Sequence, residues 1–137
     1  MGIGTEIVRQ FFVEYAKHDT GALADLLQPH ASWTVMSIAL PGSGIHSGRE
    51  RILQDFLLPI RAQFEPVAMD VRVDSIVSND RMAMAESRTV GKMKSGQIYR
   101  NRYCWSFDIE DGRIASVREY FDTLYTALIL KVVSLAH

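Results

Sequence analysis

The last third of the chain alternates between large apolar and polar positions in two runs that flank one turn. From Tyr99 to Phe107 the odd-numbered positions carry the bulkier side chains, and a second alternating run ends at Phe121. The Asp111-Gly112 pair lies between these runs. Two alternating runs around Asp-Gly are a strong hairpin signal. The pattern therefore predicts a β-hairpin over residues 99–122.

Glu119 interrupts the apolar face of this hairpin. It lies between Val117 and Phe121 on the parity that faces the interior. A carboxylate on a core face is costly unless it is paired or used. We therefore expect Glu119 to belong either to a functional site or to a buried ionic network.

The rest of the chain divides into a helical part and a strand-rich part. Apolar residues at helical spacing, with their capping and proline signals, predict helices over residues 5–17, 20–27 and 48–61. A strand is expected over 31–38 and a glycine-rich loop over 40–47. Alternation over 66–77 and 81–92 adds two strands before the hairpin, and a helical stripe over 123–136 closes the chain.

This order of elements predicts a fold of the α+β class, in one domain over residues 1–137. Four antiparallel strands joined by short turns form a meander, so we expect a curved antiparallel sheet that forms a cone. The three helices of the N-terminal half would pack on its concave face, with a further C-terminal helix. Such an arrangement encloses a pocket, which is the default position for a binding site.

The composition of the chain limits the classes of binding partner that we expect. Hydrophobic residues make up 47% of the chain, and 15 basic against 16 acidic residues give a net charge of −1. No block of like charge occurs, so we expect no nucleic-acid and no membrane partner. Cys104 is the one cysteine and the N-terminus lacks a signal peptide, which favours a cytoplasmic location.

Five polar residues of the predicted meander are candidates for catalysis. If same-parity residues of adjacent strands share a face, all five point into the concave side. Arg88 would bridge one carboxylate, and the other would be left with a raised pKa suited to acid–base chemistry. The same residues could instead form a structural ion network. The candidates are Glu119, Glu86, Arg88, Asn101 and Tyr103.

Large aromatic residues near the mouth of the cone suit a flat, hydrophobic ligand. Trp33, Trp105 and Phe121 are the candidates, and His46 lies in the glycine-rich loop that would overhang the pocket. No His, Cys, Asp or Glu cluster has metal-ligand spacing, and the glycines lack a phosphate-binding fingerprint. We therefore expect no metal and no cofactor.

The hairpin residues resemble a known family. The string from Tyr103 through Asp111-Gly112-Arg113-Ile114 to Arg118-Glu119-Tyr120-Phe121-Asp122 is similar to the closing hairpin of SnoaL-like proteins. These belong to the superfamily of nuclear transport factor 2-like (NTF2-like) and ketosteroid isomerase-like cones. Asp19, Trp33 and Gly48-Arg49-Glu50 support the resemblance. It implies the cone fold, and a reaction among isomerisation, cyclisation, dehydration and epoxide hydrolysis, or ligand binding alone.

The resemblance also implies roles for single positions. The acid–base carboxylate of SnoaL-type polyketide cyclases and of limonene-type epoxide hydrolases matches Glu119. The arginine and second carboxylate of the hydrolases match Glu86 and Arg88 in swapped order. The general base of ketosteroid isomerases matches Val35, which we expect to line the pocket. Their oxyanion tyrosine falls one helical turn from Tyr15, which could take its place.

Three hypotheses follow. The first is a cofactor-independent enzyme that binds a small hydrophobic molecule with a carbonyl, hydroxyl or epoxide, with Glu119 as the proton-transfer group. The second is a ligand-binding module without turnover. The third is a dimerisation module, because cones of this superfamily often form homodimers through the open sheet face. The outward row of that face would be Arg100, Arg102, Cys104 and Ser106.

Overall fold

The computed structural model describes residues 2–134. One six-stranded sheet has the order β2-β1-β6-β5-β4-β3. The helices are α1 (Ile3–Ala16), α2 (Gly21–Asp25), α3 (Arg49–Arg51), the π-helix η1 (Ile52–Leu57), α4 (Leu58–Arg61) and α5 (Thr123–Ile129). The strands are β1 (Leu27–Val35), β2 (Gly44–Ser47), β3 (Asp70–Ser78), β4 (Met82–Lys92), β5 (Ile98–Glu110) and β6 (Arg113–Phe121).

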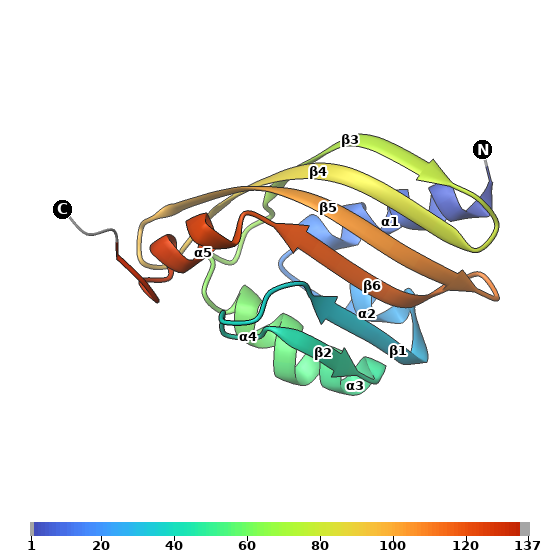
Figure 1. Cartoon of the computed structure of the whole chain (residues 1–137), viewed down its shortest axis with the longest axis horizontal. Coiled ribbons are helices and arrows are strands. Elements are labelled where there is room, and N and C mark those ends of the chain that lie inside the picture. The colour runs from blue at the N-terminus through green and yellow to red at the C-terminus, as the bar shows by residue number, and fades with distance from the viewer. Residues whose placement is uncertain (1, 135–137) are drawn as a thin grey trace.

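The sheet is curved and open, and α1, α2 and the α3–η1–α4 segment lie against one side of it (Figure 1). The α+β cone expected from the sequence is therefore confirmed. β3, β4, β5 and β6 form the predicted antiparallel meander. β1 pairs in parallel with β6, and β2 pairs antiparallel with β1.

An aromatic core joins α1 to the sheet. The Phe11 ring lies 5.6 Å from Trp33, 5.5 Å from Trp105 and 5.0 Å from Phe107 between ring centroids. The contacts with Trp105 and Phe107 are edge-to-face, and such contacts add to the stability gained by burying apolar area. The odd-numbered residues of β5 face this core, as the alternation predicts.

The prediction of which β4 side chains point into the cone is wrong. Glu86 and Arg88 are exposed, and the inward residues are the small ones. Arg88 pairs across the ladder with Arg102, whereas Ser87 pairs with Tyr103. The reason is steric: the aromatic side chains of α1 and β5 already fill the space over β4, so only small residues fit beneath them. The inward residues of β4 are Ala83, Ala85, Ser87, Thr89 and Gly91.

Several element boundaries also differ from the prediction. Pro29 lies within β1 instead of ending a helix, at an irregularity between Leu27 and Ser32 where a strand tolerates proline. The predicted loop contains β2, and the predicted third helix includes the π-helical turn η1. α5 ends at Ile129, before the expected end at Ala136, which lies outside the described residues.

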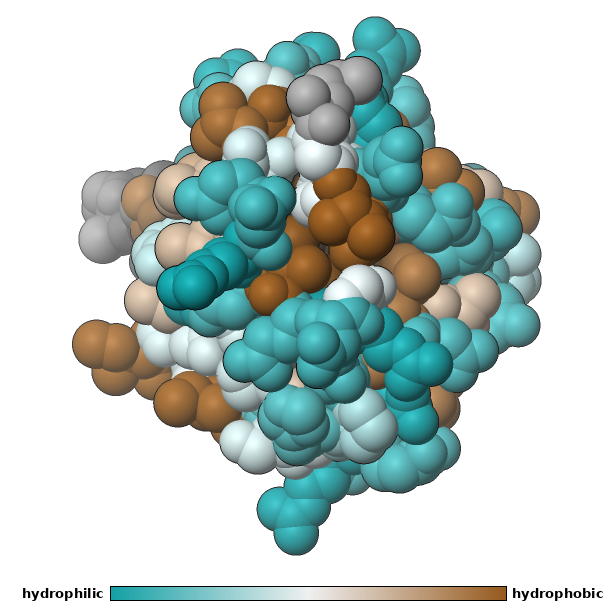
Figure 2. Space-filling view, turned by 90° about the vertical axis from the view of Figure 1, so that its right-hand side faces the viewer, coloured by the Kyte–Doolittle hydropathy of each residue, from teal (hydrophilic) through white to brown (hydrophobic). Residues whose placement is uncertain are grey.

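The two ends of the cone differ. α5 and the loop before β2 lie at one end, and the start of α1 lies at the other (Figure 1). Polar side chains cover most of the end at which α1 begins, with apolar side chains between them (Figure 2). None of the helices within residues 2–134 combines the length and the apolar character that crossing a membrane requires.

Candidate functional site

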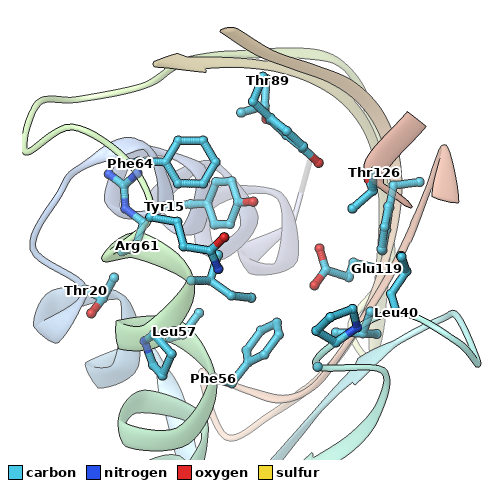
Figure 3. Close-up of a pocket in the computed structure, with 18 of the residues that line it drawn as sticks. Tyr15, Thr20, Leu40, Phe56, Leu57, Arg61, Phe64, Thr89, Glu119 and Thr126 are labelled. Carbon is cyan, nitrogen blue, oxygen red and sulfur yellow. The ribbon is translucent and has the colours of Figure 1, made fainter. Parts of the chain in front are cut away.

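A cavity of about 260 Å³ lies between the concave face of the sheet and the helices (Figure 3). α1 contributes Tyr15, β1 contributes Trp33 and Val35, and β6 contributes Glu119 and Phe121. The remaining lining is mostly apolar. It includes Leu23, Leu40, Pro41, Phe56, Leu57, Ile60, Phe64, Met69, Met93, Tyr99, Tyr103 and Leu130.

Glu119 is the buried carboxylate of this cavity. Its side chain is 7% exposed, and the Trp33 indole Nε1 donates a hydrogen bond to its Oε1 at 3.0 Å. Burial raises the pKa of Glu119 from its usual 4.5 to about 7, against a smaller lowering by the Trp33 hydrogen bond. Both protonation states are therefore populated near neutral pH.

The predicted ion pair between Arg88 and a cavity carboxylate does not form. Arg88 binds Asp74 on the outer face, with Nη2 2.8 Å from Oδ1 and Nε 3.1 Å from Oδ2. Glu86 accepts a hydrogen bond from Ser75 on the same face at 3.0 Å. None of the ion pairs found within residues 2–134 includes Glu119. The pKa of Glu119 is therefore raised by burial and not lowered by a neighbouring cation.

Three tyrosines, Tyr15, Tyr99 and Tyr103, line the cavity together with Glu119. The hydroxyl oxygens of Tyr99 and Tyr103 are hydrogen-bonded, 2.5 Å apart. Burial raises the pKa of all three phenols, so they remain protonated at neutral pH. The Tyr15 hydroxyl and the Glu119 carboxylate point toward one another across the cavity (Figure 3). A ligand oxygen between them would meet phenol donors on one side and a carboxyl group on the other.

Asn101 lies behind the tyrosines and does not line the cavity. It is 6% exposed, and its Nδ2 lies 2.9 Å from the Tyr99 hydroxyl and 2.9 Å from Thr126 Oγ1. The expected role in contacting substrate or water directly is therefore not supported by its position, although Asn101 is on the predicted face of β5.

The other expected ligand contacts divide into two groups. Trp33, Tyr15, Val35 and Phe121 line the cavity as predicted, together with Tyr103. Trp105 is fully buried in the core, where its Nε1 donates to Ser87 Oγ at 2.9 Å. It is therefore a core residue and not a ligand contact.

His46 is half-buried and lies outside the cavity lining. Its ring stacks on Phe56 at 4.5 Å, and its Nε2 is 2.7 Å from the Gly42 carbonyl oxygen. Both contacts go to residues that line the cavity. His46 thus braces the cavity wall from outside.

Arg61 is a cavity residue that the sequence analysis missed. It is 6% exposed, and its Nη2 donates to the carbonyls of Ala16 at 3.3 Å and Lys17 at 2.5 Å. The guanidinium thus covers the C-terminal end of α1, where a cation is favourable. Burial lowers the pKa of Arg61. Its place four residues after Leu57, on the inward face of the helical segment, is the signal that could have found it.

The described residues, 2–134, contain no group of three His, Cys, Asp or Glu side chains that could hold a metal ion. The polar side chains that line the cavity are the carboxyl groups of Glu119 and Asp55, three phenols, threonine hydroxyls, the Gln63 amide and the Arg61 guanidinium.

A helix-covered, cone-shaped sheet around an apolar cavity with one buried carboxyl group is the architecture of an NTF2-like fold. The sequence model of the SnoaL-like domain matches residues 8–117, and the chain belongs to this family. No curated protein sequence matches the chain significantly.

Solved structures share the fold. An NTF2-like protein from Anabaena variabilis is 24% identical, with a TM-score of 0.75 over 88% of this chain and 90% of that one. A candidate SnoaL-like polyketide cyclase from a Jannaschia species is 18% identical, with a TM-score of 0.74 over 98% and 94%. TerC, crystallised with polyporic acid, is 12% identical, with a TM-score of 0.78 over 95% and 98%. At these identities the likeness establishes the fold alone.

Proposed function

We propose that this protein is a cofactor-independent acid–base catalyst that acts on a small, mostly apolar molecule with a carbonyl group. The observation that carries the proposal is Glu119, a carboxyl group with a pKa of about 7 inside an apolar cavity. A general base is most effective when its pKa lies near the working pH. Isomerisation and cyclisation are the reaction types that the resemblance to SnoaL-like proteins implies for this chemistry.

The chemistry needs only groups of this chain. The Glu119 carboxylate would take a proton from the carbon next to the carbonyl, and the bond electrons would move to the carbonyl oxygen. Tyr15 and Tyr103, which are protonated, would donate hydrogen bonds to that oxygen as it becomes negative. The protonated Glu119 would then return its proton to another carbon or to oxygen, which regenerates the carboxylate.

The hydrogen bond from Trp33 distinguishes the two carboxylate oxygens of Glu119. Trp33 donates to Oε1, which leaves Oε2 as the oxygen available for proton transfer. The aromatic and aliphatic lining suits the apolar body of a ligand, and the size of the cavity suits a compact one. The shared fold of TerC and of the candidate polyketide cyclase also supports a ligand-binding role for this cavity.

The direct test is titration of the side-chain carboxyl carbons by NMR, with the Glu119 signal assigned from the Glu119→Gln variant. We expect a pKa near 7. Deuterium uptake from D₂O by enolisable ketones such as 2-tetralone then measures base catalysis, and Glu119→Gln should abolish it while the fold is kept. A Glu119 pKa below about 4.3 would contradict the proposal, because the group would be a permanent anion.

A second candidate function is ligand binding without turnover. Val35, the direct cross-strand neighbour of Glu119, is apolar, so this wall of the cavity supplies no second acid or base beside the first. A ligand that raises the melting temperature but never exchanges or rearranges would favour this function.

Dimerisation through the outer face of the sheet, and a cytoplasmic location, also remain proposals. That face exposes Met82 at 41% and Met84 at 44%, and the outward Arg100 and Arg102 lie on the same face toward the other end of the β4–β5 ladder, which supports a homodimer. A monomer in analytical ultracentrifugation at micromolar concentration would contradict it. The single, free Cys104 supports a reducing compartment.

A further inference from the structure

We propose that Asn101 is a positioning residue that sets the direction of the tyrosine hydrogen bonds, so that their hydrogens run toward the cavity. This inference deepens the proposed function, on which it rests, because it concerns the donors that meet the substrate oxygen. Asn101 does not line the cavity but hydrogen-bonds two residues that do, Tyr99 and Thr126, which distinguishes it from the residues that contact a ligand.

The orientation of the Asn101 amide is fixed by its neighbours. Its Oδ1 accepts from the backbone N–H groups of Arg102 at 2.8 Å and Asp122 at 3.3 Å. Nδ2 therefore faces the other way, toward the Tyr99 hydroxyl and Thr126 Oγ1, each at 2.9 Å. An amide nitrogen can only donate, so the Tyr99 oxygen must accept this hydrogen bond.

The Thr126 hydroxyl agrees with this orientation. It donates its own hydrogen to the Asp122 carbonyl at 3.1 Å, which leaves its oxygen free to accept from Asn101. Each of the two amide hydrogens of Asn101 therefore has an acceptor, and a flipped amide would turn its NH₂ group toward two backbone N–H donors, which would lose their acceptor.

Direction then passes along the tyrosines. Since the Tyr99 oxygen accepts from Asn101, its hydrogen is free to point to the Tyr103 oxygen, 2.5 Å away. Tyr103 lines the cavity, so its own hydrogen is left for an acceptor there. Hydrogen bonds in such a row polarise one another and strengthen the last donor.

The direction has a consequence for ligand choice. A row that ends in a donor suits an acceptor oxygen, such as that of a ketone, a quinone or an enolate. It disfavours an ammonium or another group that can only donate. Asn101 would thus select the substrate class without contacting the substrate.

The first test needs neither substrate nor variant. Protein with ¹³C-labelled tyrosine rings allows the hydroxyl hydrogen between Tyr99 and Tyr103 to be assigned through its coupling to ring carbons. We expect it to couple to the ring of Tyr99. Coupling to the ring of Tyr103 would mean that the row runs away from the cavity and would overturn the proposal, whatever the protein catalyses.

The second test reverses the row. Asn101→Asp keeps an acceptor for Arg102 and Asp122 but replaces the donating nitrogen with an oxygen, so Tyr99 must donate to it at pH 8. We expect the bridging hydrogen to couple to Tyr103 and the rate of deuterium uptake by 2-tetralone to fall about 100-fold, as for loss of a donor to a developing oxyanion. An unchanged coupling in a folded Asn101→Asp variant would overturn the proposal.

Tyr125→Phe is the matched control. The Tyr125 hydroxyl also joins α5 to β5, since it donates to the Ile98 carbonyl at 3.1 Å and accepts from the Arg100 N–H at 2.9 Å. It does not line the cavity. We expect this variant to lose stability while the coupling and the exchange rate stay within about 2-fold. Equal losses in both variants would mean that Asn101 serves only to attach α5.

Discussion

The indole nitrogen of Trp33 lies 3.0 Å from Oε1 of Glu119, across the parallel pairing of β1 with β6. This is the one hydrogen bond that Glu119 receives from a side chain within residues 2–134, and it favours the ionised form. The two residues together therefore decide how much of the carboxyl group is charged near neutral pH.

Replacing Trp33 with Phe should raise the pKa of Glu119. Loss of a hydrogen bond to the charged form of a buried group is worth about 1.4 kcal/mol, so we expect the pKa to move from about 7 to about 8. Carboxyl-carbon NMR titration measures it. The comparison variant is Phe11→Leu, which alters the packing around Trp33 without removing its N–H group. If the pKa stays the same or falls in Trp33→Phe, the hydrogen bond does not support the carboxylate.

Glu119 should make the fold less stable as the pH rises. Its folded pKa, about 7, lies above the usual 4.5, so the folded state holds the proton more tightly than the unfolded chain. The loss begins above about pH 4.5 and is complete above about pH 7, where it amounts to roughly 3 kcal/mol.

Glu119→Gln should remove this pH dependence. Urea unfolding at pH 5 and pH 8 measures it: the variant should gain stability over the wild type at pH 8, and much less at pH 5. A constant difference between the two proteins at both pH values would contradict a raised pKa.

Arg88→Ala should leave the site untouched. Its guanidinium binds Asp74 on the outer face, half-exposed, where ion pairs contribute little. We expect an unchanged Glu119 pKa and an unchanged melting temperature. A clear shift of the Glu119 titration in this variant would bring Arg88 back to the cavity side.

Arg61→Leu should destabilise the protein. The substitution removes a buried guanidinium that donates to the last carbonyls of α1, and such hydrogen bonds to charged groups are worth about 1.5–3 kcal/mol. Urea unfolding should show a loss of that size. Arg51→Leu, at an exposed position of α3, is the control and should change stability by less than about 0.5 kcal/mol. Equal effects would mean that Arg61 is not anchored to α1.

The comparison of β5 with β4 explains how far the sequence could predict the site. Tyr103 and Phe107 of β5 have smaller or polar neighbours on both sides, so side-chain size and polarity indicated the same buried parity. In β4, Met82 and Met84 put apolar residues on one parity and small residues occupied the other. The inward parity of β4 depended on whether the space over this strand was already full. The aromatic residues that fill this space come from α1 and β5, so the sequence of β4 alone could not show it.

Glu119 was predictable because it is a carboxylate on an unambiguous strand face. Its partners were less so. Trp33 was expected as an aromatic surface for a ligand, whereas its contact with Glu119 uses the N–H group and depends on the parallel pairing of β1 with β6. That pairing joins segments 86 residues apart, and local patterns carry no signal for it.

The pairing of β1 with β6 also has a consequence for folding. Because Glu119 and Trp33 are 86 residues apart in the chain, we expect the cavity to be assembled after the local hairpins have formed. A nascent chain without β6 lacks both the carboxylate and the strand that holds Trp33. Ligands of the cavity should therefore bind only the completed chain and, by mass action, draw refolding toward it. Ligand binding would thus distinguish the completed chain from a chain that still lacks β6.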